Sequence, residues 1–323
     1  MAKNNSKIEY TFQNIFRGSE SASLRLPLVI IDSGEKGPTV WLTACIHGDE
    51  VGGIIVTQEM TKLLKKQLQK GKIYIFPLMN PTGFESVSRN VAISGEDLNR
   101  AFPGSETGSV ASRIAHQIFS TIIDTKPDLV LDLHNDWSRS IPLVFIDEDP
   151  GEEFKKSYDK TKKIAKLSGF VNILDTENFK NTLTYNLLKN NIPALTIELG
   201  ESYVVNEQNV AMGIKSVWNI LSSLGMLKNK KKFLYKLPEK VANKTLIYSD
   251  KPFSSSSGIV RFYHKPGEMV KKGEIMGAIF DVLGNEQQKI IALDNGIVLG
   301  TTDFAAVFPG SVIMAFGNIN RKK

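Results

Sequence analysis

Short apolar segments alternate with amphipathic ones between residues 38 and 225. The apolar segments are rich in β-branched or aromatic residues and run almost without interruption, as strands covered on both faces do. They are TVWLTACI (39–46), KIYIFPLMN (72–80), PDLVLDLH (127–134), IPLVFID (141–147) and PALTIELG (193–200). Helical patterns fall at residues 50–68, 109–123, 151–167, 184–191 and 209–224. This alternation predicts a three-layer α/β/α sandwich with a largely parallel or mixed sheet.

The pattern changes after about Met226. A lysine-rich segment at residues 228–240 and a serine run at 254–257 precede short strand-like pieces that glycines separate. Frequent glycine without a helical period is typical of a small all-β barrel or sandwich. We therefore expect two domains, an α/β domain over residues 1–227 and a β-rich, barrel-like domain over residues 228–323.

Composition limits the kind of protein this can be. The chain has 323 residues, of which 41% are hydrophobic, enough for one large core and a second small one. Cys45 is the single cysteine, and the first residues, MAKNNSKIEY, lack the apolar stretch of a secretory signal. No apolar run approaches the ~18 to 20 residues of a membrane span. We expect a cytoplasmic protein that makes no contact with a membrane.

The net charge of +6 raises the question of nucleic-acid binding. Much of the excess comes from lysines in the segment at 228–240, whereas charges elsewhere are mixed along predicted helices, as in KKSYDKTKKIAK (155–166). Mixed charge of this kind is typical of a solvated helix face. We expect no nucleic-acid partner, and an assembly of several copies of the chain stays open.

Residues with metal-binding chemistry stand at the ends of two predicted strands. His47 and Glu50 follow the strand at 39–46, and His134 ends the strand at 127–134. In open α/β sheets this edge is where ligands bind. Two histidines, one carboxylate and an open fourth position are typical of catalytic zinc, so we predict one Zn²⁺ per chain. For His116 and His264 we expect ordinary roles, in helix packing or at the surface and in a loop.

A hydrolase also needs a group that moves protons. Glu198 is the candidate, because it follows apolar residues in PALTIELG; pairing with a lysine or a place at the strand edge is the alternative. The polar loop at residues 80–104 carries Arg89, Asn99 and Arg100, and long loops in α/β proteins usually serve a function. An arginine binds a carboxylate through two hydrogen bonds or stabilises an oxyanion. Simple solvation is the alternative for these arginines.

Five motifs, in this order, resemble the succinylglutamate desuccinylase and aspartoacylase family of the zinc carboxypeptidase-like superfamily. They are HGDE (47–50), NPTG (80–83), DLNRAFPG (97–104), DLH (132–134) and ELG (198–200). Each motif is weak alone, and the set is specific.

The resemblance implies a role for each candidate residue. His47, Glu50 and His134 would hold zinc, and Glu198 would be the general base. Asn99 and Arg100 would bind the α-carboxylate of an amino-acid moiety, and Arg89 would stabilise the oxyanion. Among the neighbouring carboxylates, Asp97 would orient its loop and Asp49 would support the turn of the HGDE motif. Asp132 would contact a metal-ligating residue or lie at the strand end.

The C-terminal segment is similar to biotinyl or lipoyl carrier domains, in GEMVKKGEIMGAIFDV followed by DNGIV. The spacing in those domains places the modified lysine at Leu283 or Asn285, and neither is a lysine. We therefore expect a lid or packing domain without a swinging arm.

The nature of the substrate side chain stays open at this point. Family members that act on acidic amino acids tend to carry a further basic residue between the third metal ligand and the base, yet no arginine occurs between Arg139 and Arg261. Lys180 or Lys189 could substitute, or the side chain is not acidic.

The leading hypothesis is a zinc-dependent deacylase that hydrolyses the linear amide of a small N-acyl amino acid or similar acylated metabolite. The alternatives are a metallocarboxypeptidase, which needs an open groove, and a non-catalytic zinc-binding module.

Overall fold

The computed structural model describes residues 6–17, 23–176, 179–228, 232–242 and 244–319. Up to residue 228 the elements are β1 (Lys7–Arg17), β2 (Ser23–Asp32), β3 (Thr39–Ala44), α1 (Gly52–Gln67), β4 (Lys72–Phe76), α2 (Pro81–Glu85), the 3₁₀ helix η1 (Leu98–Arg100), α3 (Val110–Asp124), β5 (Leu129–Asp136), β6 (Arg139–Ser140), β7 (Leu143–Ile146), the 3₁₀ helix η2 (Glu152–Phe154), α4 (Lys155–Ala165), β8 (Val171–Leu174), α5 (Leu183–Leu188), β9 (Ala194–Glu201) and α6 (Glu207–Ser223). Beyond it lie β10 (Thr245–Ser249), β11 (Gly258–Phe262), β12 (Met269–Val270), β13 (Ile275–Phe280), β14 (Glu286–Ile291), β15 (Gly296–Thr301), β16 (Ala306–Val307) and β17 (Met314–Asn318).

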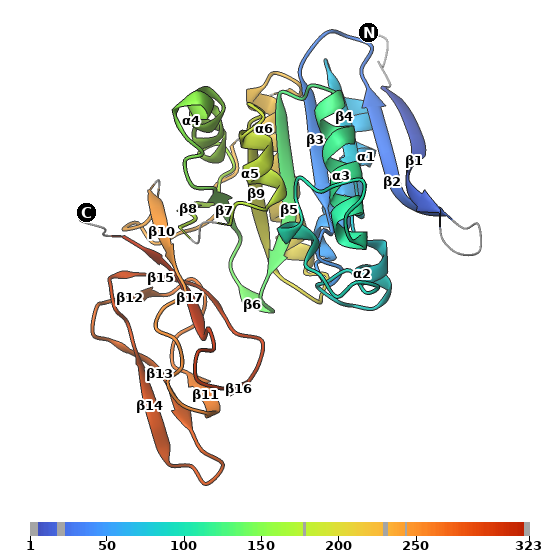
Figure 1. Ribbon diagram of the computed structural model, residues 1–323. Helices are drawn as coiled ribbons and strands as arrows, with labels where there is room; N and C mark the ends of the chain where they lie inside the picture. Colours follow the sequence, from blue (N-terminus) through green and yellow to red (C-terminus); the bar gives the residue numbers. More distant parts are fainter. Residues whose placement is uncertain (1–5, 18–22, 177–178, 229–231, 243, 320–323) are drawn as a thin grey trace.

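A mixed sheet forms the centre of the molecule (Figure 1). Within the described residues it has 13 strands in the order β1-β2-β4-β3-β5-β9-β7-β8-β10-β17-β15-β12, with β6 beside β15. Strands β4, β3, β5 and β9 run parallel to one another, and β7 is antiparallel to β9. The predicted mixed α/β sheet is confirmed.

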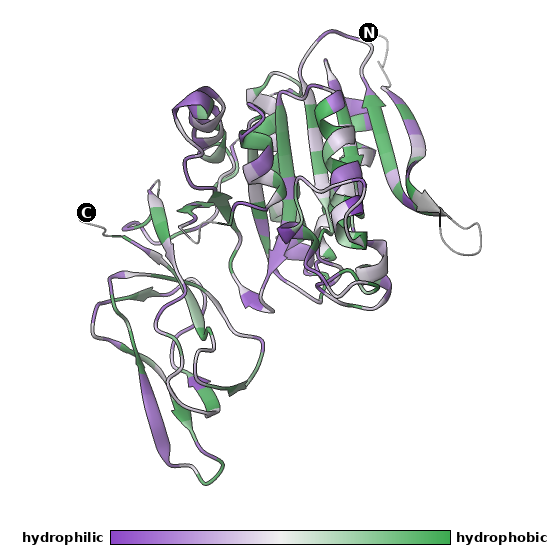
Figure 2. Ribbon diagram, in the orientation of Figure 1, coloured by the Kyte–Doolittle hydropathy of each residue, from purple (hydrophilic) through white to green (hydrophobic). Residues whose placement is uncertain are grey.

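Helices cover both faces of this sheet, because successive side chains of a strand point to opposite sides. In β3, Val40 and Leu42 pack in a cluster with α1, α4 and α6, whereas Trp41 between them packs in a second cluster with α3 and α5. Trp41 stacks on Tyr74 with 5.0 Å between ring centroids. Figure 2 shows the central strands as mostly hydrophobic, as burial on two faces requires.

The sequence pattern located the central strands and helices and missed others. Each predicted apolar segment contains a strand, and each helical segment contains a helix. The antiparallel pair β1 and β2 was missed, and so was the short helix α2 inside the predicted loop. Strand β8 was missed because its segment, VNIL, is too short to show a period.

The C-terminal region extends the large sheet. Strand β10 pairs in parallel with β8, and β17 and β15 follow it. Strands β14, β13, β11 and β16 form a separate antiparallel sheet, with four strands in the part of the chain that the structure describes. The predicted boundary after residue 227 falls between α6 and β10 and stays a prediction, as does a barrel-like closure.

Two sequence predictions concern surface segments. Leu283 and Asn285, where a carrier domain would bear its lysine, lie in the turn between β13 and β14, and the Asp281 carboxylate accepts hydrogen bonds from both backbone N–H groups at 2.9 Å. Of the lysine-rich segment, residues 229–231 lie outside the described residues.

No helix among those described is long and apolar enough to cross a membrane.

A substitution of Leu131, in the middle of β5, would test the packing of the core beneath the carboxyl edge of the sheet. Its side chain is fully buried in the cluster shared with α1 and α6. We expect Leu131→Ala to lower the free energy of unfolding by about 2–5 kcal/mol, because it removes buried apolar contacts and leaves a cavity. Val282→Ala, at a side chain that is 88% exposed, is the control and changes stability by less than about 0.5 kcal/mol. Equal urea midpoints for the two variants would contradict this packing.

Candidate active site

The turn between β3 and α1 places His47 and Glu50 at the carboxyl edge of the sheet. Cys45 turns the backbone with a φ of 54°, and the Glu50 N–H donates to the His47 carbonyl at 3.2 Å. Gly48 is needed because a Cβ there would overlap the backbone of Gly83 in α2. The two side chains consequently point inward and are 3% and 4% exposed.

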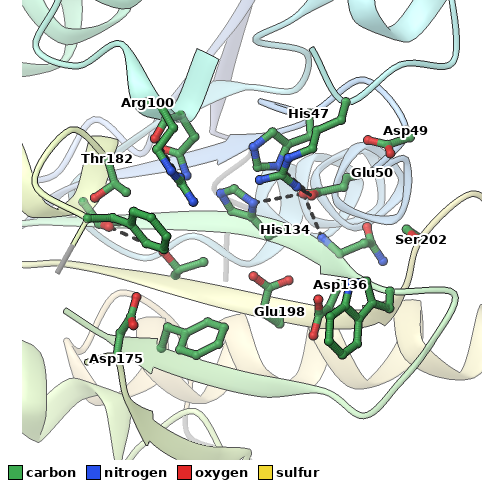
Figure 3. Close-up of a pocket in the computed structure, with 18 of the residues that line it drawn as sticks. His47, Asp49, Glu50, Arg100, His134, Asp136, Asp175, Thr182, Glu198 and Ser202 are labelled. Carbon is green, nitrogen blue, oxygen red and sulfur yellow. Dashed lines mark hydrogen bonds and ion pairs between the residues drawn. The ribbon is translucent and has the colours of Figure 1, made fainter. Parts of the chain in front are cut away.

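His134 reaches the same point from β5. The Glu50 carboxylate lies between the two imidazoles, with Oε1 2.6 Å from His47 Nδ1 and Oε2 2.9 Å from His134 Nδ1 (Figure 3). One ligand-type atom from each of the three residues lies within 4.8 Å of the others. The structure thus brings together two nitrogens and one carboxylate oxygen that are far apart in the sequence.

The opposite nitrogen of each imidazole contacts a carboxylate. His134 Nε2 lies 2.9 Å from Asp132 Oδ2, and the Thr43 hydroxyl donates to Asp132 Oδ1 at 2.6 Å. His47 Nε2 lies 3.1 Å from Asp97 Oδ1. A carboxylate on Nε2 favours a proton there and directs the Nδ1 lone pair toward a metal.

Charge holds this cluster together against the cost of burial. Burial alone raises the pKa of Glu50, but the charges of His47 and His134 outweigh it and bring that pKa well below its usual range. Burial alone lowers the pKa of His134, and the carboxylates of Asp132 and Glu50 instead raise it well above its usual value. The buried charges therefore compensate one another.

The donor set fits zinc. Two imidazole nitrogens and one carboxylate oxygen are common protein ligands of catalytic zinc, and the carboxylates behind both imidazoles are the usual support of such ligands. The backbone N–H of Asn135 also donates to Glu50 Oε2 at 3.1 Å, which orients the carboxylate. These residues could hold one divalent ion.

Glu198 lies opposite His134 across the paired strands β9 and β5, so both side chains are on the same face. It is 8% exposed, and its Oε2 has no hydrogen-bond partner among the described residues. Burial raises its pKa well above the usual value, helped by the charges of Glu50 and Asp136 and opposed by those of His134 and Arg89. A buried carboxyl group with a raised pKa that faces the cluster is suited to proton transfer.

Arg89 lies beside the cluster and is positioned by Asp97. Its Nε and Nη2 donate to Asp97 Oδ2 at 3.2 and 3.1 Å, and its Nη1 lies 3.6 Å from Glu50 Oε1. The His47 and Arg89 contacts outweigh burial and hold the pKa of Asp97 well below its usual range. Asp97 also accepts from the Asn99 N–H at 2.8 Å and so begins η1.

Asn99 and Arg100 lie on η1, where the loop meets α5. The Asn99 Oδ1 accepts from the Leu183 N–H at 3.0 Å, which fixes the amide. The Arg100 guanidinium lies over the Phe179 ring, 3.9 Å from its centroid. Such a fixed guanidinium can bind a planar carboxylate.

The three metal-type residues line one cavity of about 560 Å³ together with Glu198, Arg89, Asn99 and Arg100. Its wall consists of His47, Asp49, Glu50, Arg89, Asn99, Arg100, His134, Asn135, Asp136, Trp137, Phe145, Asp147, Asp175, Phe179, Thr182, Thr184, Thr196, Glu198, Ser202, Tyr203, Tyr248, Asp303 and Phe304. Tyr248, Asp303 and Phe304 come from the C-terminal region, which therefore closes one side of the cavity. The Ser138 N–H donates to Asp303 at 2.6 Å and ties that side to the segment that follows β5.

Several lining residues were missed by the sequence reasoning. Asn135 connects three elements, because it accepts from Gly52 N–H of α1 and donates to carbonyls of β9; only its place beside His134 could have singled it out. Asp147 ends a predicted strand, which was a usable signal. Asp175 follows β8, which was not predicted.

The other two histidines lie away from the cavity. His116 on α3 has its Nε2 3.4 Å from Glu106, and His264 has nitrogens 3.3 Å from Glu268 and 3.5 Å from Glu274.

The fold and this cluster define a class: a carboxypeptidase-like α/β protein with a His-Glu-His group at the carboxyl edge of its sheet. A metallo-carboxypeptidase from Burkholderia cenocepacia has the same core fold, with a TM-score of 0.54 at 15% identity over 69% of this chain and 65% of that one.

A family model, the "Succinylglutamate desuccinylase/Aspartoacylase catalytic domain", matches residues 36–224 of this chain. The chain belongs to this family, as its motifs predicted. It is 26% identical over 271 residues to the N-alpha-acetyl-L-2,4-diaminobutyric acid deacetylase of Halomonas elongata, covering 80% of this chain and 75% of that protein. It also shares its fold with an aspartoacylase family protein from Mesorhizobium loti, with a TM-score of 0.82 and 22% identity over 100% of this chain and 98% of the other.

The contact between Thr43 and Asp132 can be tested by an isosteric substitution. Thr43→Val leaves one oxygen of the fully buried Asp132 without its donor. We expect a loss of about 1–3 kcal/mol in the free energy of unfolding, measured in urea. Thr121→Val is the control, because its half-buried hydroxyl bonds only to a carbonyl of its own helix. A loss no larger than that of the control would show that Thr43 does not support the cluster.

Proposed function

We propose that this protein is a zinc-dependent hydrolase that cleaves the amide bond of an N-acyl amino acid or similar small acylated metabolite. One observation carries the proposal: the buried Glu198, whose Oε2 has no hydrogen-bond partner among the described residues, faces the same cavity as the three converging metal-type side chains. The relative from Halomonas elongata, whose name describes the removal of an acetyl group from an amino acid, supports the same reaction class.

His47, Glu50 and His134 would hold the zinc. When bound there, zinc supplies Lewis acidity, which polarises a carbonyl group and makes water acidic enough to act as a nucleophile near neutral pH. Asp97 contacts the far nitrogen of His47, and Asp132 contacts that of His134. These contacts keep the donor atoms in place before an ion binds.

Glu198 would act as the general base. Its raised pKa lets the carboxylate accept a proton from the attacking water and then deliver it to the leaving nitrogen. The newly formed carboxylic acid and the free amine are the products. A base with an ordinary, low pKa would be a poorer donor in the second step.

Arg89, Asn99 and Arg100 would orient the substrate. Asn99 and Arg100 would bind its α-carboxylate, so that the scissile carbon stays near the attacking water. Arg89, fixed by two hydrogen bonds to Asp97, would donate to the carbonyl oxygen as negative charge develops on it.

A metallocarboxypeptidase remains the second candidate, since it would use the same groups on a longer substrate. The wall formed by Tyr248, Asp303 and Phe304 favours a small substrate over a peptide that must lie across an open groove.

Zinc binding tests the ligand assignment without any turnover. We expect purified protein, stripped with a chelator and equilibrated with Zn²⁺, to retain one ion per chain by elemental analysis after dialysis. His134→Ala removes one of three ligands and should abolish this stoichiometric binding. The control, His116→Ala, should bind as the wild type does. Retention of a full equivalent by the His134 variant would contradict the assignment.

The role of Glu198 is tested with a panel of N-acyl amino acids and release of free amine as the measure. We expect Glu198→Gln to lower kcat by about 10²–10⁴-fold with an unchanged zinc content, because the amide cannot accept the proton. Glu207→Gln, at the exposed start of α6, is the matched control.

Two results would count against the proposal. Undiminished turnover in the Glu198→Gln variant would show that Glu198 is not the general base. Stepwise shortening of peptides from the C-terminus, without hydrolysis of any N-acyl amino acid, would favour the carboxypeptidase.

A further inference from the structure

The cavity continues past the metal-type residues on the side away from Arg100. In Figure 3, Arg100 lies on one side of these residues, and Asp49, Asp136 and Ser202 lie on the other. Under the proposed function the α-carboxylate would be bound at Arg100 and the scissile amide would lie at Glu198. The acyl group of the substrate would therefore extend into this second part of the cavity.

Three segments of the chain meet in this part of the cavity. The Tyr203 N–H donates to the Asp49 carbonyl at 3.0 Å, which joins the segment after β9 to the turn of the HGDE motif. The Ser138 N–H donates to Asp303 at 2.6 Å, which joins the segment after β5 to the C-terminal region. We call this part the far end of the cavity; it is lined by Asp49, Asp136, Trp137, Tyr203, Asp303 and Phe304.

Aromatic side chains form part of the wall and the rim of the far end. Gly300 of β15 pairs with Ser140 of β6, and a Cβ at Gly300 would lie 2.9 Å from the Trp137 ring, so β15 packs directly against that indole. Tyr203 and Phe304 are exposed and lie where the cavity meets solvent. Aromatic faces accept methylene groups and attract cations.

The three carboxylates of the far end are opposed by little positive charge. Arg89 is already engaged, because its Nε and Nη2 donate to Asp97 and its Nη1 lies 3.6 Å from Glu50. Asp49 is also close enough to act on the charge of Arg89. One guanidinium therefore faces more carboxylates than it can pair.

No lysine among the described residues lines the cavity. Lys180 and Lys189, which the sequence left open as carboxylate-binding residues, are exposed and do not border it. An acyl group that carries its own carboxylate, such as succinyl, would therefore meet like charge at the far end.

Asp49 indicates that the far end takes a ligand with a hydrogen-bond donor. The residue is 7% exposed, and its Oδ1 has no hydrogen-bond partner among the described residues. It borders the cavity, on the same side of the metal-type residues as Asp136 (Figure 3). A buried carboxylate oxygen without a donor is costly, and a donor on the ligand would complete it.

We propose that the far end binds an ammonium group carried by the acyl moiety, so that the substrates are aminoacyl amino acids such as β-alanyl amino acids. This inference rests on the proposed function for the positions of the α-carboxylate and the amide. The ammonium group donates to Asp49, and Asp136 and Asp303 add negative charge around it. Hydrolysis adds one water across the C–N bond and releases two free amino acids.

Three acyl groups of matched length test the inference. The β-alanyl, butyryl and succinyl derivatives of one amino acid end in an ammonium, a methyl and a carboxylate group on the same two methylenes. The amino acid is that of the fastest N-acetyl substrate, and its release is measured by chromatography. We expect kcat/KM for the β-alanyl compound to exceed that of the butyryl compound by about tenfold or more, as for a hydrogen bond to a charged group. Preference for the butyryl or the succinyl compound would overturn the inference.

Acetylation of the β-alanyl ammonium group separates the inference from a carboxypeptidase. The acetylated compound is longer and neutral, so its kcat/KM should fall by about tenfold or more relative to the β-alanyl compound. Equal or faster cleavage of the acetylated compound would show that the far end takes a peptide chain and would overturn the inference.

Asparagine substitutions identify the residues responsible. Asp303→Asn keeps an oxygen that can accept from the Ser138 N–H and removes one negative charge. We expect Asp303→Asn and Asp136→Asn each to bring the ratio of kcat/KM between the β-alanyl and butyryl compounds toward one. A merely structural defect would lower both values and leave their ratio unchanged. Asp294→Asn, at an exposed residue outside the cavity, is the matched control and should keep the wild-type ratio. A wild-type ratio in both test variants would contradict the assignment.

A binding measurement separates this inference from the proposed function. Calorimetry on Glu198→Gln, with L-alanine as the amino acid if no N-acetyl compound turns over, should give about tenfold tighter binding of the β-alanyl than of the butyryl compound. Adding Asp303→Asn should shrink this difference. Absence of turnover on every N-acyl amino acid would overturn the proposed reaction, while the binding difference would still support the far end as an ammonium site. Equal binding of the two compounds would overturn the inference even if the reaction stands.

Discussion

The contact of one buried carboxylate with two imidazoles organises the carboxyl edge of the central sheet. The two oxygens of Glu50 lie 2.6 Å from His47 Nδ1 and 2.9 Å from His134 Nδ1, in a place where all three side chains are almost fully buried. Buried charges are tolerated only when they are paired and hydrogen-bonded. The pairing of β3 with β5 supplies that arrangement, because parallel neighbours end at the same edge of the sheet.

The rest of the cavity is built outward from this contact. Asp132 and Asp97 stand behind the imidazoles, and each brings in another segment of the chain, through Thr43 and through Arg89. Asp97 also begins η1, so the loop that carries the candidate carboxylate-binding residues is fixed by the same group that supports His47. One set of charge-assisted hydrogen bonds thereby joins the metal-type residues to the loop that carries Asn99 and Arg100.

The sequence predicted what depends on local pattern. Continuous apolar segments located β3, β5 and β9, and the family motifs placed His47, Glu50, His134 and Glu198 at their ends. What it could not predict depends on pairing between segments: VNIL at β8 is too short to show a period, so the position of Asp175 beside Asp147 was hidden. The insertion of β10 next to β8, which brings Tyr248 to the cavity, likewise leaves no local signal.

The loop at residues 80–104 shows the same division. Its polar and glycine-rich composition predicted a functional loop, and that part of the chain does line the cavity. The composition does not show that Asn99 Oδ1 accepts from the N–H of Leu183, a contact between residues 84 positions apart. Long-range hydrogen bonds of this kind fix the geometry of the site and are invisible to a reading along the chain.

Anomalous X-ray diffraction at the zinc edge, on crystals grown with zinc, tests the central claim most directly. We predict one strong anomalous peak about 2.0–2.2 Å from His47 Nδ1, His134 Nδ1 and a Glu50 oxygen, with Asp97 and Asp132 still in contact with the far imidazole nitrogens. A crystal with ordered side chains and no peak between these three residues, or with zinc held elsewhere in the chain, would contradict the account.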